Sequence, residues 1–282
     1  PSNQQLDTPY PYRSLTLPQS PATVLDINRY PTMITESANQ YSGAYFNTRN
    51  LSGAEQITLT VDAPETVQLI PVDAYSGAWM WYSHRGDSMD SRLNREFDLT
   101  GVDNATLNFQ VWYDIENGWD YGYVMASVNG GATWDILQAN TTTDFNPYGN
   151  AYGDGFAGQS GGWLAQSVSL RAYVGGRVLL RFEMITDEAL NLNNMAIDDV
   201  SIPEIGYFDD FEQGAGNWVA EGWMRIDNRL PQRYHLIVIY SDGDTFELWR
   251  KIGTGESSWT VPINPNMDTG WVILAPMADV TT

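Results

Sequence analysis

Carboxylates are the side chains of this sequence best placed to do chemistry, and two of them are adjacent at Asp198 and Asp199. In an extended strand Asp198 shares a face with Ala196 and Val200, which puts it on the apolar side. Burying a carboxylate is costly unless it meets a cation, an arginine or several backbone donors. Because Ca²⁺ takes hard oxygen ligands from several segments, we predict a structural calcium site here.

The predicted calcium site combines Asp198 or Asp199 with carboxylates from elsewhere in the chain, either Asp87 and Asp90 or Asp209, Asp210 and Glu212. The candidate ligands are Asp198, Asp199, Asp87, Asp90, Asp209, Asp210 and Glu212. The alternative interpretation is a solvated acidic edge, since the chain has 35 acidic residues against 14 basic ones. A melting temperature that responds neither to chelator nor to added Ca²⁺ would favour that alternative.

A second acidic run contains Asp114, Glu116 and Asp120. Glycosidases use two carboxylates at a set separation, and this run could be read as such an acid and base pair. We favour a structural role, in which these carboxylates close a loop between strands by accepting backbone hydrogen bonds. Nucleophilic hydrolysis is disfavoured, because the chain has no cysteine and no serine stands in a recognisable arrangement with histidine and aspartate.

The charge balance limits the partners of the chain. A net charge of −21 repels phosphate backbones and anionic lipid, so we predict no nucleic-acid binding and no docking on membrane surfaces. No apolar run approaches the ~20 residues of a membrane-spanning helix, and we predict no membrane span. The absence of cysteine excludes disulfides and thiolate metal sites. Because residue 1 is Pro1 and no signal peptide is visible, we interpret the chain as a mature or excised fragment.

Apolar residues alternate with polar ones in the segments that must position these carboxylates. On residues 106–113 one face carries Leu107, Phe109, Val111 and Tyr113, and residues 178–184 repeat the pattern with Val178, Leu180, Phe182 and Met184. A two-residue period predicts half-buried antiparallel strands, and no convincing helical period is present. The sequence therefore predicts an all-β fold, an antiparallel jelly-roll or β-sandwich with flanking smaller β-rich segments.

Four segments are predicted along the chain. Residues 1–22 are rich in proline, which prevents helix and removes sheet donors, so they form an extended linker or strap. Residues 23–72 form a short β segment, 73–203 the jelly-roll sandwich, and 204–282 a C-terminal β-rich domain. We expect 204–282 to pack with 23–72 as one split domain. The glycine-rich loop 144–162 is predicted to be functional or to wrap over the core.

Several runs, in order along the chain, resemble one family. The sequence reads SGAWMW at 76–81, RGD at 85–87, WYDIENGWDY at 112–121, VNGGATW at 128–134 and NMAIDDVSIPE at 194–204. These runs resemble the accessory β-sandwich of immune inhibitor A-like metallopeptidases, a MAM-type jelly roll. The flanking segments are similar to that family as well, though less specifically.

The resemblance implies a non-catalytic role for this chain. Catalysis in that family requires zinc held by two histidines one helical turn apart, with a glutamate between them. Here Arg85 follows His84 and Leu236 follows His235, so the motif does not exist and no zinc is expected. We therefore expect a secreted, extracellular, bacterial accessory region. It would support the catalytic domain of the same parent chain and bring it to protein substrates or a cell surface.

Two other classes of function stay open. In a carbohydrate-binding module, exposed aromatics would stack on sugars, and the candidates are Trp79, Trp81, Trp112, Trp119, Trp134 and Trp163. We expect at least part of this set to be core, because Trp79 and Trp81 share one strand face and Ala78 and Met80 share the other. In a self-assembling or surface-layer protein, the segment 1–22 would pair with the sheet edge of the next subunit.

Overall fold

The computed structural model describes residues 24–242, 244–267 and 269–278, and these residues form strands, loops and short 3₁₀ turns. The predicted all-β class is therefore confirmed. None of the helices in this described part of the chain is long and apolar enough to cross a bilayer. The predicted Pro-rich strap at 1–22 lies outside the described residues.

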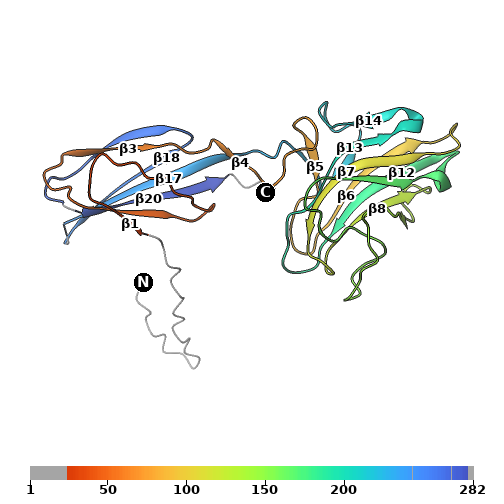
Figure 1. Ribbon diagram of the computed structural model, residues 1–282, viewed down its shortest axis with the longest axis horizontal. Coiled ribbons are helices and arrows are strands. Elements are labelled where there is room, and N and C mark those ends of the chain that lie inside the picture. The colour runs from red at the N-terminus through yellow and green to blue at the C-terminus, as the bar shows by residue number, and fades with distance from the viewer. Residues whose placement is uncertain (1–23, 243, 268, 279–282) are drawn as a thin grey trace, which may run out of the picture. The chain divides into compact units, whose positions relative to one another are not determined.

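The chain divides into two compact units (Figure 1). Among the described residues, unit 1 combines those from 24 to 67 with those from 230 to 278, and unit 2 consists of residues 68–229. Unit 1 therefore draws its strands from both sides of unit 2 in the sequence, which places the two flanks of the jelly roll in one unit.

Unit 1 contains two sheets. Its strands are β1 (Val24–Ile27), β2 (Ala44–Thr48), β3 (Gln56–Val61), β4 (Thr66–Val67), β17 (Leu230–Ser241), β18 (Phe246–Gly253), β19 (Ser257–Pro262) and β20 (Thr269–Ala278). The larger sheet has the order β1-β2-β20-β17-β18, with β4 paired to the start of β17, and β19 pairs with β3. Alternate residues Leu236, Val238 and Tyr240 of β17 are buried in one core with Val261 of β19. The two sheets thus share a hydrophobic core.

Unit 2 is a sandwich of two antiparallel sheets. Its elements are β5 (Met80–Tyr82), β6 (Asp90–Asp98), β7 (Thr106–Ile115), β8 (Tyr121–Ser127), β9 (Asp135–Ile136), β10 (Gly158–Gln159), β11 (Leu164–Ser169), η1 (Arg171–Tyr173), β12 (Arg177–Ile185), β13 (Asn194–Ile202), η2 (Pro203–Ile205), β14 (Tyr207–Asp209), β15 (Val219–Glu221) and β16 (Met224–Ile226). One sheet has the order β10-β7-β13-β5-β16, with β11 on β7 and β14 on β13. The other has the order β15-β6-β12-β8-β9.

The core of unit 2 lies between these sheets. The predicted inward faces of β7 and β12 are both buried, which confirms the two-residue period. Phe182 of β12 packs edge-on against Phe109 of β7, with ring centroids 4.9 Å apart. The ring centroids of Trp218 and Phe182 are 5.7 Å apart. Aromatic rings from opposite sheets thus fill the centre, as expected for large apolar side chains in a sandwich.

The sandwich extends beyond the boundary predicted after Pro203. The strands β14, β15 and β16 pair with β13, β6 and β5 of unit 2, although the sequence assigned them to the C-terminal domain. Phe211, Trp218 and Trp223 lie in the core of unit 2. The turn at η2 returns the chain directly onto β13, so Pro203 ends a strand without ending the unit. The change between units falls at residues 229 and 230.

Three loops of unit 2 meet through hydrogen bonds. The Thr186 N–H, after β12, donates to the Met89 carbonyl before β6. The Asp187 N–H donates to the Asp120 side chain in the loop between β7 and β8. The Asn194 side chain at the start of β13 donates to the His84 carbonyl. These loops position the candidate site described next.

Candidate metal centre

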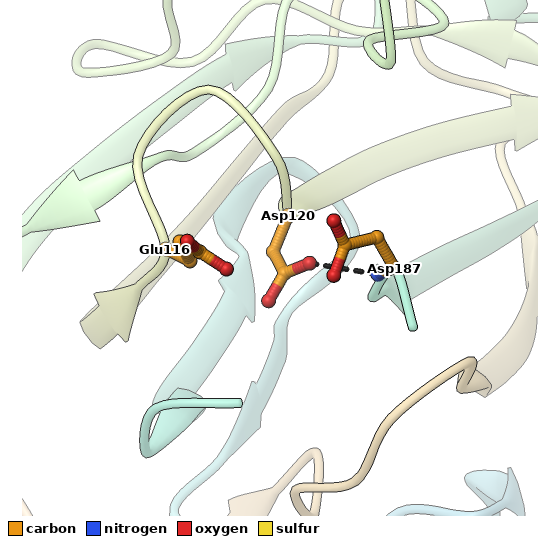
Figure 2. A group of neighbouring side chains, drawn as sticks. All are labelled: Glu116, Asp120 and Asp187. Atoms are coloured by element: carbon orange, nitrogen blue, oxygen red, sulfur yellow. Dashed lines mark hydrogen bonds between the residues drawn. The ribbon is translucent and has the colours of Figure 1, made fainter. Parts of the chain in front are cut away.

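Three carboxylates gather at the ends of strands in unit 2, and we define Glu116, Asp120 and Asp187 as the carboxylate cluster. Glu116 follows β7, Asp120 precedes β8, and Asp187 comes shortly after β12. One oxygen from each carboxylate lies within 4.8 Å of those from the other two. In Figure 2, Asp120 lies between Glu116 and Asp187. Since β7 belongs to one sheet and β8 and β12 to the other, the cluster joins side chains from both sheets.

Asp120 is the most deeply placed member of the cluster. It is 0% exposed, and its Oδ1 accepts a 2.8 Å hydrogen bond from the backbone N–H of Asp187. Its Oδ2 is buried and has no hydrogen-bond partner. Burial raises the pKa of Asp120 to about 6, although the Asp187 amide opposes the shift, and the charges of Asp187, Glu116 and Asp87 raise it further.

Among the described residues, no arginine or lysine forms an ion pair with the carboxylate cluster. Burial, followed by the charge of Asp187, raises the pKa of Glu116 as well. All ion pairs between side chains of the described residues involve carboxylates outside the cluster. Three acidic groups therefore share one place without an arginine or lysine partner there.

The loop between β7 and β8 is a tight turn that holds Glu116 and Asp120 close together. The Glu116 carbonyl accepts hydrogen bonds from the N–H groups of Trp119 and Asp120. Gly118 has a φ of 89°, a left-handed conformation that glycine adopts without strain. A Cβ at Gly118 would also lie 2.9 Å from Pro147. Glycine at this position therefore allows both the turn and the close approach of the loop 144–162.

The predicted aspartate pair has other partners. Asp198 is fully buried, as predicted, and its Oδ2 and Oδ1 accept hydrogen bonds of 3.1 and 2.8 Å from the N–H groups of Ser76 and Asp199. Asp199 Oδ1 accepts a 2.6 Å hydrogen bond from Ser76 Oγ. Burial raises the pKa of Asp198 to about 7, although the backbone donors oppose the shift. Backbone donors thus occupy both oxygens of Asp198.

Glu212 contacts the same segment. Its Oε1 accepts hydrogen bonds of 2.8 and 2.7 Å from the N–H groups of Ala78 and Trp79. Gly77 has a φ of 58°, and a Cβ there would lie 2.4 Å from the Glu212 carboxyl carbon. The structure therefore brings Asp198, Asp199 and Glu212 together around residues 76–79, which we call the pinned loop.

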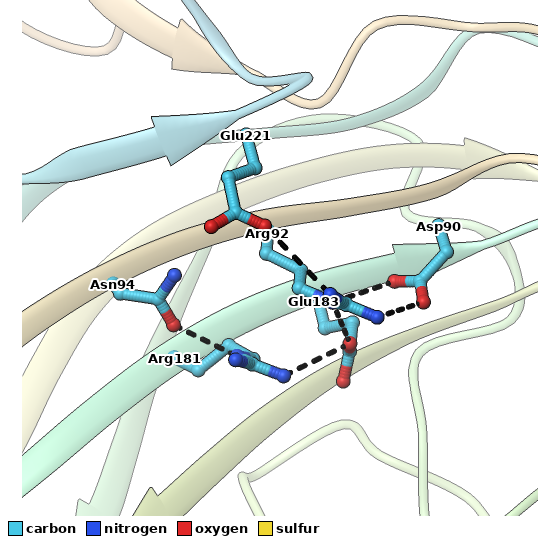
Figure 3. Close-up of polar contacts among 6 residues, drawn as sticks. All are labelled: Asp90, Arg92, Asn94, Arg181, Glu183 and Glu221. Carbon is cyan, nitrogen blue, oxygen red and sulfur yellow. Dashed lines mark hydrogen bonds and ion pairs between the residues drawn. The ribbon is translucent and has the colours of Figure 1, made fainter. Parts of the chain in front are cut away.

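Asp90 belongs to an ion-pair network on the outer face of β6 and β12 (Figure 3). Its carboxylate accepts hydrogen bonds from Arg92, and Arg92 Nε also donates to Glu183 at 2.9 Å. Arg181 Nη1 reaches the same Glu183 oxygen at 3.2 Å, and Glu221 lies 3.7 Å from Arg92. The charge of Asp90 is therefore paired with arginine.

The remaining predicted ligands are dispersed. Asp87 accepts a hydrogen bond from the Asn191 side chain. Asp209 Oδ2 lies 3.5 Å from Arg95 Nη1. Asp210 accepts a hydrogen bond from the N–H of Glu212, two residues further along the chain. None of the seven belongs to the carboxylate cluster found among the described residues, and calcium binding at those seven positions stays a prediction.

Sequence reasoning found part of the cluster. It assigned Asp114, Glu116 and Asp120 to loop closure, and the hydrogen bond from Asp187 N–H to Asp120 confirms that Asp120 accepts a backbone donor. An acid and base pair for sugar hydrolysis is disfavoured, because the buried Asp120 offers no surface to a substrate. No sequence pattern indicated that Asp187 belongs to the cluster, because only the pairing of β12 with β8 brings it to this loop.

The histidines and tryptophans are spread over the molecule. His84 belongs to unit 2 and His235 to unit 1, and neither is in a group of three or more potential metal ligands within the described ranges. Trp81 and Trp112 are buried, so the six tryptophans do not form one surface. Trp119 is 38% exposed and stacks on Tyr148, with ring centroids 4.2 Å apart.

Unit 2 thus defines a class, a two-sheet antiparallel sandwich with acidic loops at its strand ends. The family model described as the immune inhibitor A-like MAM domain matches residues 45–228. The chain therefore belongs to the immune inhibitor A-like MAM domain family, as its sequence motifs predicted.

The chain is also similar to several curated proteins. The chain is 27% identical over 182 residues to the pre-pro-metalloprotease PrtV of Vibrio cholerae, an alignment that covers 64% of this chain and 19% of the relative. It is 26% identical over 200 residues to immune inhibitor A of Bacillus thuringiensis, covering 70% of this chain and 27% of the relative. Bacillopeptidase F of Bacillus subtilis is 26% identical over 98 residues. The chain thus spans about a fifth of the length of PrtV and about a quarter of the length of immune inhibitor A.

Proposed function

We propose that this chain is the non-catalytic accessory region of a secreted bacterial zinc metallopeptidase. The observation that carries the proposal is the match of residues 45–228 to an immune inhibitor A-like MAM domain, in a chain that spans only 19% of a pre-pro-metalloprotease. The absence of a His-Glu-x-x-His motif from the sequence supports it. In this proposal the region supports the catalytic domain of its parent chain and contacts extracellular protein or a cell surface.

Unit 1 offers a surface suited to such a contact. Phe246, Leu248 and Ile252 lie on one face of the edge strand β18 and are 73%, 60% and 57% exposed. Leu248 pairs with Ile239, which pairs in turn with the exposed Trp271 of β20 on the same face. Exposed apolar side chains gathered on one sheet face are typical of interaction sites, and on this face of β18 the exposed Arg250 lies between Leu248 and Ile252. We therefore assign this face to the contact with the rest of the parent protein.

The first test is proteolysis by the purified chain. We expect no hydrolysis of casein when the chain is incubated with it in the presence of Zn²⁺, because the sequence lacks the His-Glu-x-x-His motif with which such peptidases hold zinc and activate water. An established zinc peptidase in the same buffer is the positive control. Reproducible cleavage by pure protein that a chelator abolishes would contradict the proposal.

Glycan binding is a second candidate, favoured by one exposed aromatic group. Trp119 stacks on Tyr148, and Phe145 and Tyr152 are also exposed in the loop that covers this side of unit 2. Aromatic faces of this kind stack on sugar rings. Affinity electrophoresis against polysaccharides would test the idea, with retardation expected for the natural chain and lost in Trp119→Ala. Equal mobility of both proteins in every gel would exclude this candidate.

A further inference from the structure

We propose that the carboxylate cluster of Glu116, Asp120 and Asp187 binds one Ca²⁺ ion, which links the two sheets of unit 2. This inference is independent of the accessory role proposed above, since it concerns a site within the sandwich. It also differs from the calcium site predicted from the sequence, which used seven other carboxylates.

The spacing of the oxygens fits a single calcium ion. Ca²⁺ binds oxygen ligands at about 2.3–2.6 Å, so two ligands of one ion lie at most about 5 Å apart. The three carboxylate oxygens lie within 4.8 Å of one another. This spacing allows one ion to lie among the three oxygens.

Asp120 supplies an independent indication of a ligand. Its Oδ1 is occupied by the Asp187 N–H, whereas its Oδ2 is fully buried and has no donor. A buried carboxylate oxygen without a partner is costly and calls for an explanation. Figure 2 shows this carboxylate facing the side chains of Glu116 and Asp187. A cation at this place would give Oδ2 the partner that the protein itself does not provide.

The surrounding charges point the same way. Asp87 acts on Asp120 as a fourth negative group. The arginines of the nearby network on β6 and β12 pair with Asp90 and Glu183 instead. Like charges held this close repel one another unless a cation lies between them. A divalent ion would cancel most of that repulsion.

The ligand type favours Ca²⁺ over other metals. The cluster offers only carboxylate oxygens, without the histidine or cysteine that zinc sites use. Glu116 and Asp187 are partly exposed, so waters can complete the six to eight ligands that Ca²⁺ accepts. Mg²⁺ demands a smaller and more regular octahedron, which three side chains from two different loops are not expected to form.

Terbium luminescence measures the site directly. Tb³⁺ substitutes for Ca²⁺ and emits when a nearby aromatic ring transfers energy to it, and Trp119 and Tyr121 flank Asp120 in the chain. We expect saturable emission from the natural chain, displaced by Ca²⁺ at much lower concentration than by Mg²⁺. Asp120→Asn should weaken Tb³⁺ binding by roughly 100-fold or more, since loss of an outer-shell partner alone costs roughly 10–100-fold.

Asp120→Asn keeps an oxygen for the Asp187 N–H, so the variant is expected to fold. Asp103→Asn is the matched control, because it removes the same charge from an exposed turn of unit 2. Thermal unfolding at fixed ionic strength, in EGTA or in millimolar Ca²⁺, provides the second readout. Ca²⁺ should raise the melting temperature of unit 2 in the natural chain and in Asp103→Asn, but not in Asp120→Asn.

Three outcomes would overturn the proposal. The first is no calcium effect on the natural chain, and the second is an equal effect of Mg²⁺. The third is a calcium effect that Asp120→Asn leaves unchanged, which would move the ion to another site such as the pinned loop. None of these results bears on whether the chain hydrolyses casein.

Discussion

Asp198 and Asp120 are both fully buried aspartates in the same sandwich, yet their surroundings differ. Asp198 has a backbone N–H donor on each oxygen, and with Glu212 it holds the pinned loop. Asp120 has one donor and two further carboxylates beside it. The comparison teaches that an acidic motif can predict a buried carboxylate but not the groups that stabilise its charge. Whether those groups are backbone N–H donors depends on how many the chain supplies at the same place.

The pH dependence of stability should show the largest effect at Asp198. Its pKa in the folded protein is raised from 3.8 to about 7, so the folded state holds this proton more strongly than the unfolded chain. The contribution of Asp198 to the free energy of unfolding is therefore fully present below about pH 4. It is lost as the pH rises to about 7, and the loss is up to roughly 4 kcal/mol. Urea unfolding across this range measures the free energy of unfolding of unit 2.

Asp198→Asn provides the control for that measurement, because the amide does not titrate. The difference in unfolding free energy between the natural chain and Asp198→Asn should change steadily between pH 4 and pH 7 and then level off. Both proteins should first be freed of metal with EGTA at neutral pH and then transferred to metal-free buffers, so that metal binding does not contribute. Parallel curves for the two proteins would show that Asp198 keeps an ordinary pKa.

Gly77→Ala should destabilise unit 2 by about 2 kcal/mol. The new Cβ would meet the Glu212 carboxylate at 2.4 Å, and the φ of 58° is unfavourable for alanine. Gly86→Ala is a control nearby in the sequence, since a Cβ at Gly86 meets nothing within 4 Å. The loss should be the same with and without Ca²⁺, as measured by chemical denaturation. A calcium-dependent loss would mean that the pinned loop also relies on an ion.

Glu116→Gln should have the smallest effect and the opposite sign. Without calcium, the neutral side chain relieves repulsion from Asp187, so unit 2 should gain about 0.5 kcal/mol or less. With calcium the variant should lose part of the ion-dependent stabilisation, because an amide oxygen is a weaker ligand than a carboxylate. Denaturation curves in EGTA and in Ca²⁺ measure both effects. Destabilisation by the same amount in both buffers would indicate a purely structural role for Glu116.

Local patterns were enough to predict much of the fold. The two-residue period of β7 and β12 depends only on neighbouring residues, and their inward faces are buried as predicted. The burial of Asp198 followed from the same alternation. The left-handed φ of Asp199, at a register shift in β13, has no counterpart in the sequence. Pairing between distant strands decides such irregularities.

The parts that were missed depend on tertiary contacts. Asp187 reaches the carboxylate cluster only because β12 pairs with β8, and no short-range pattern connects it with Asp120. The domain boundary was placed after Pro203 because residues 194–204 resemble the closing strand of the family's jelly roll. The aromatic residues Phe211, Trp218 and Trp223 beyond it belong to the core of the sandwich. The sequence shows that these residues are apolar. It does not show whether they pack in the core of unit 1 or in the core of unit 2.

The short pairing of β4 with β17 has a consequence for how this protein could be rebuilt. Val67 and Leu230 are direct cross-strand partners, so the chain leaves unit 1 and re-enters it at neighbouring positions. A two-residue Asn-Gly turn between them would join the two strands as an ordinary hairpin. Unit 2 is therefore an inserted domain, and another domain could replace it without changing how the strands of unit 1 are connected.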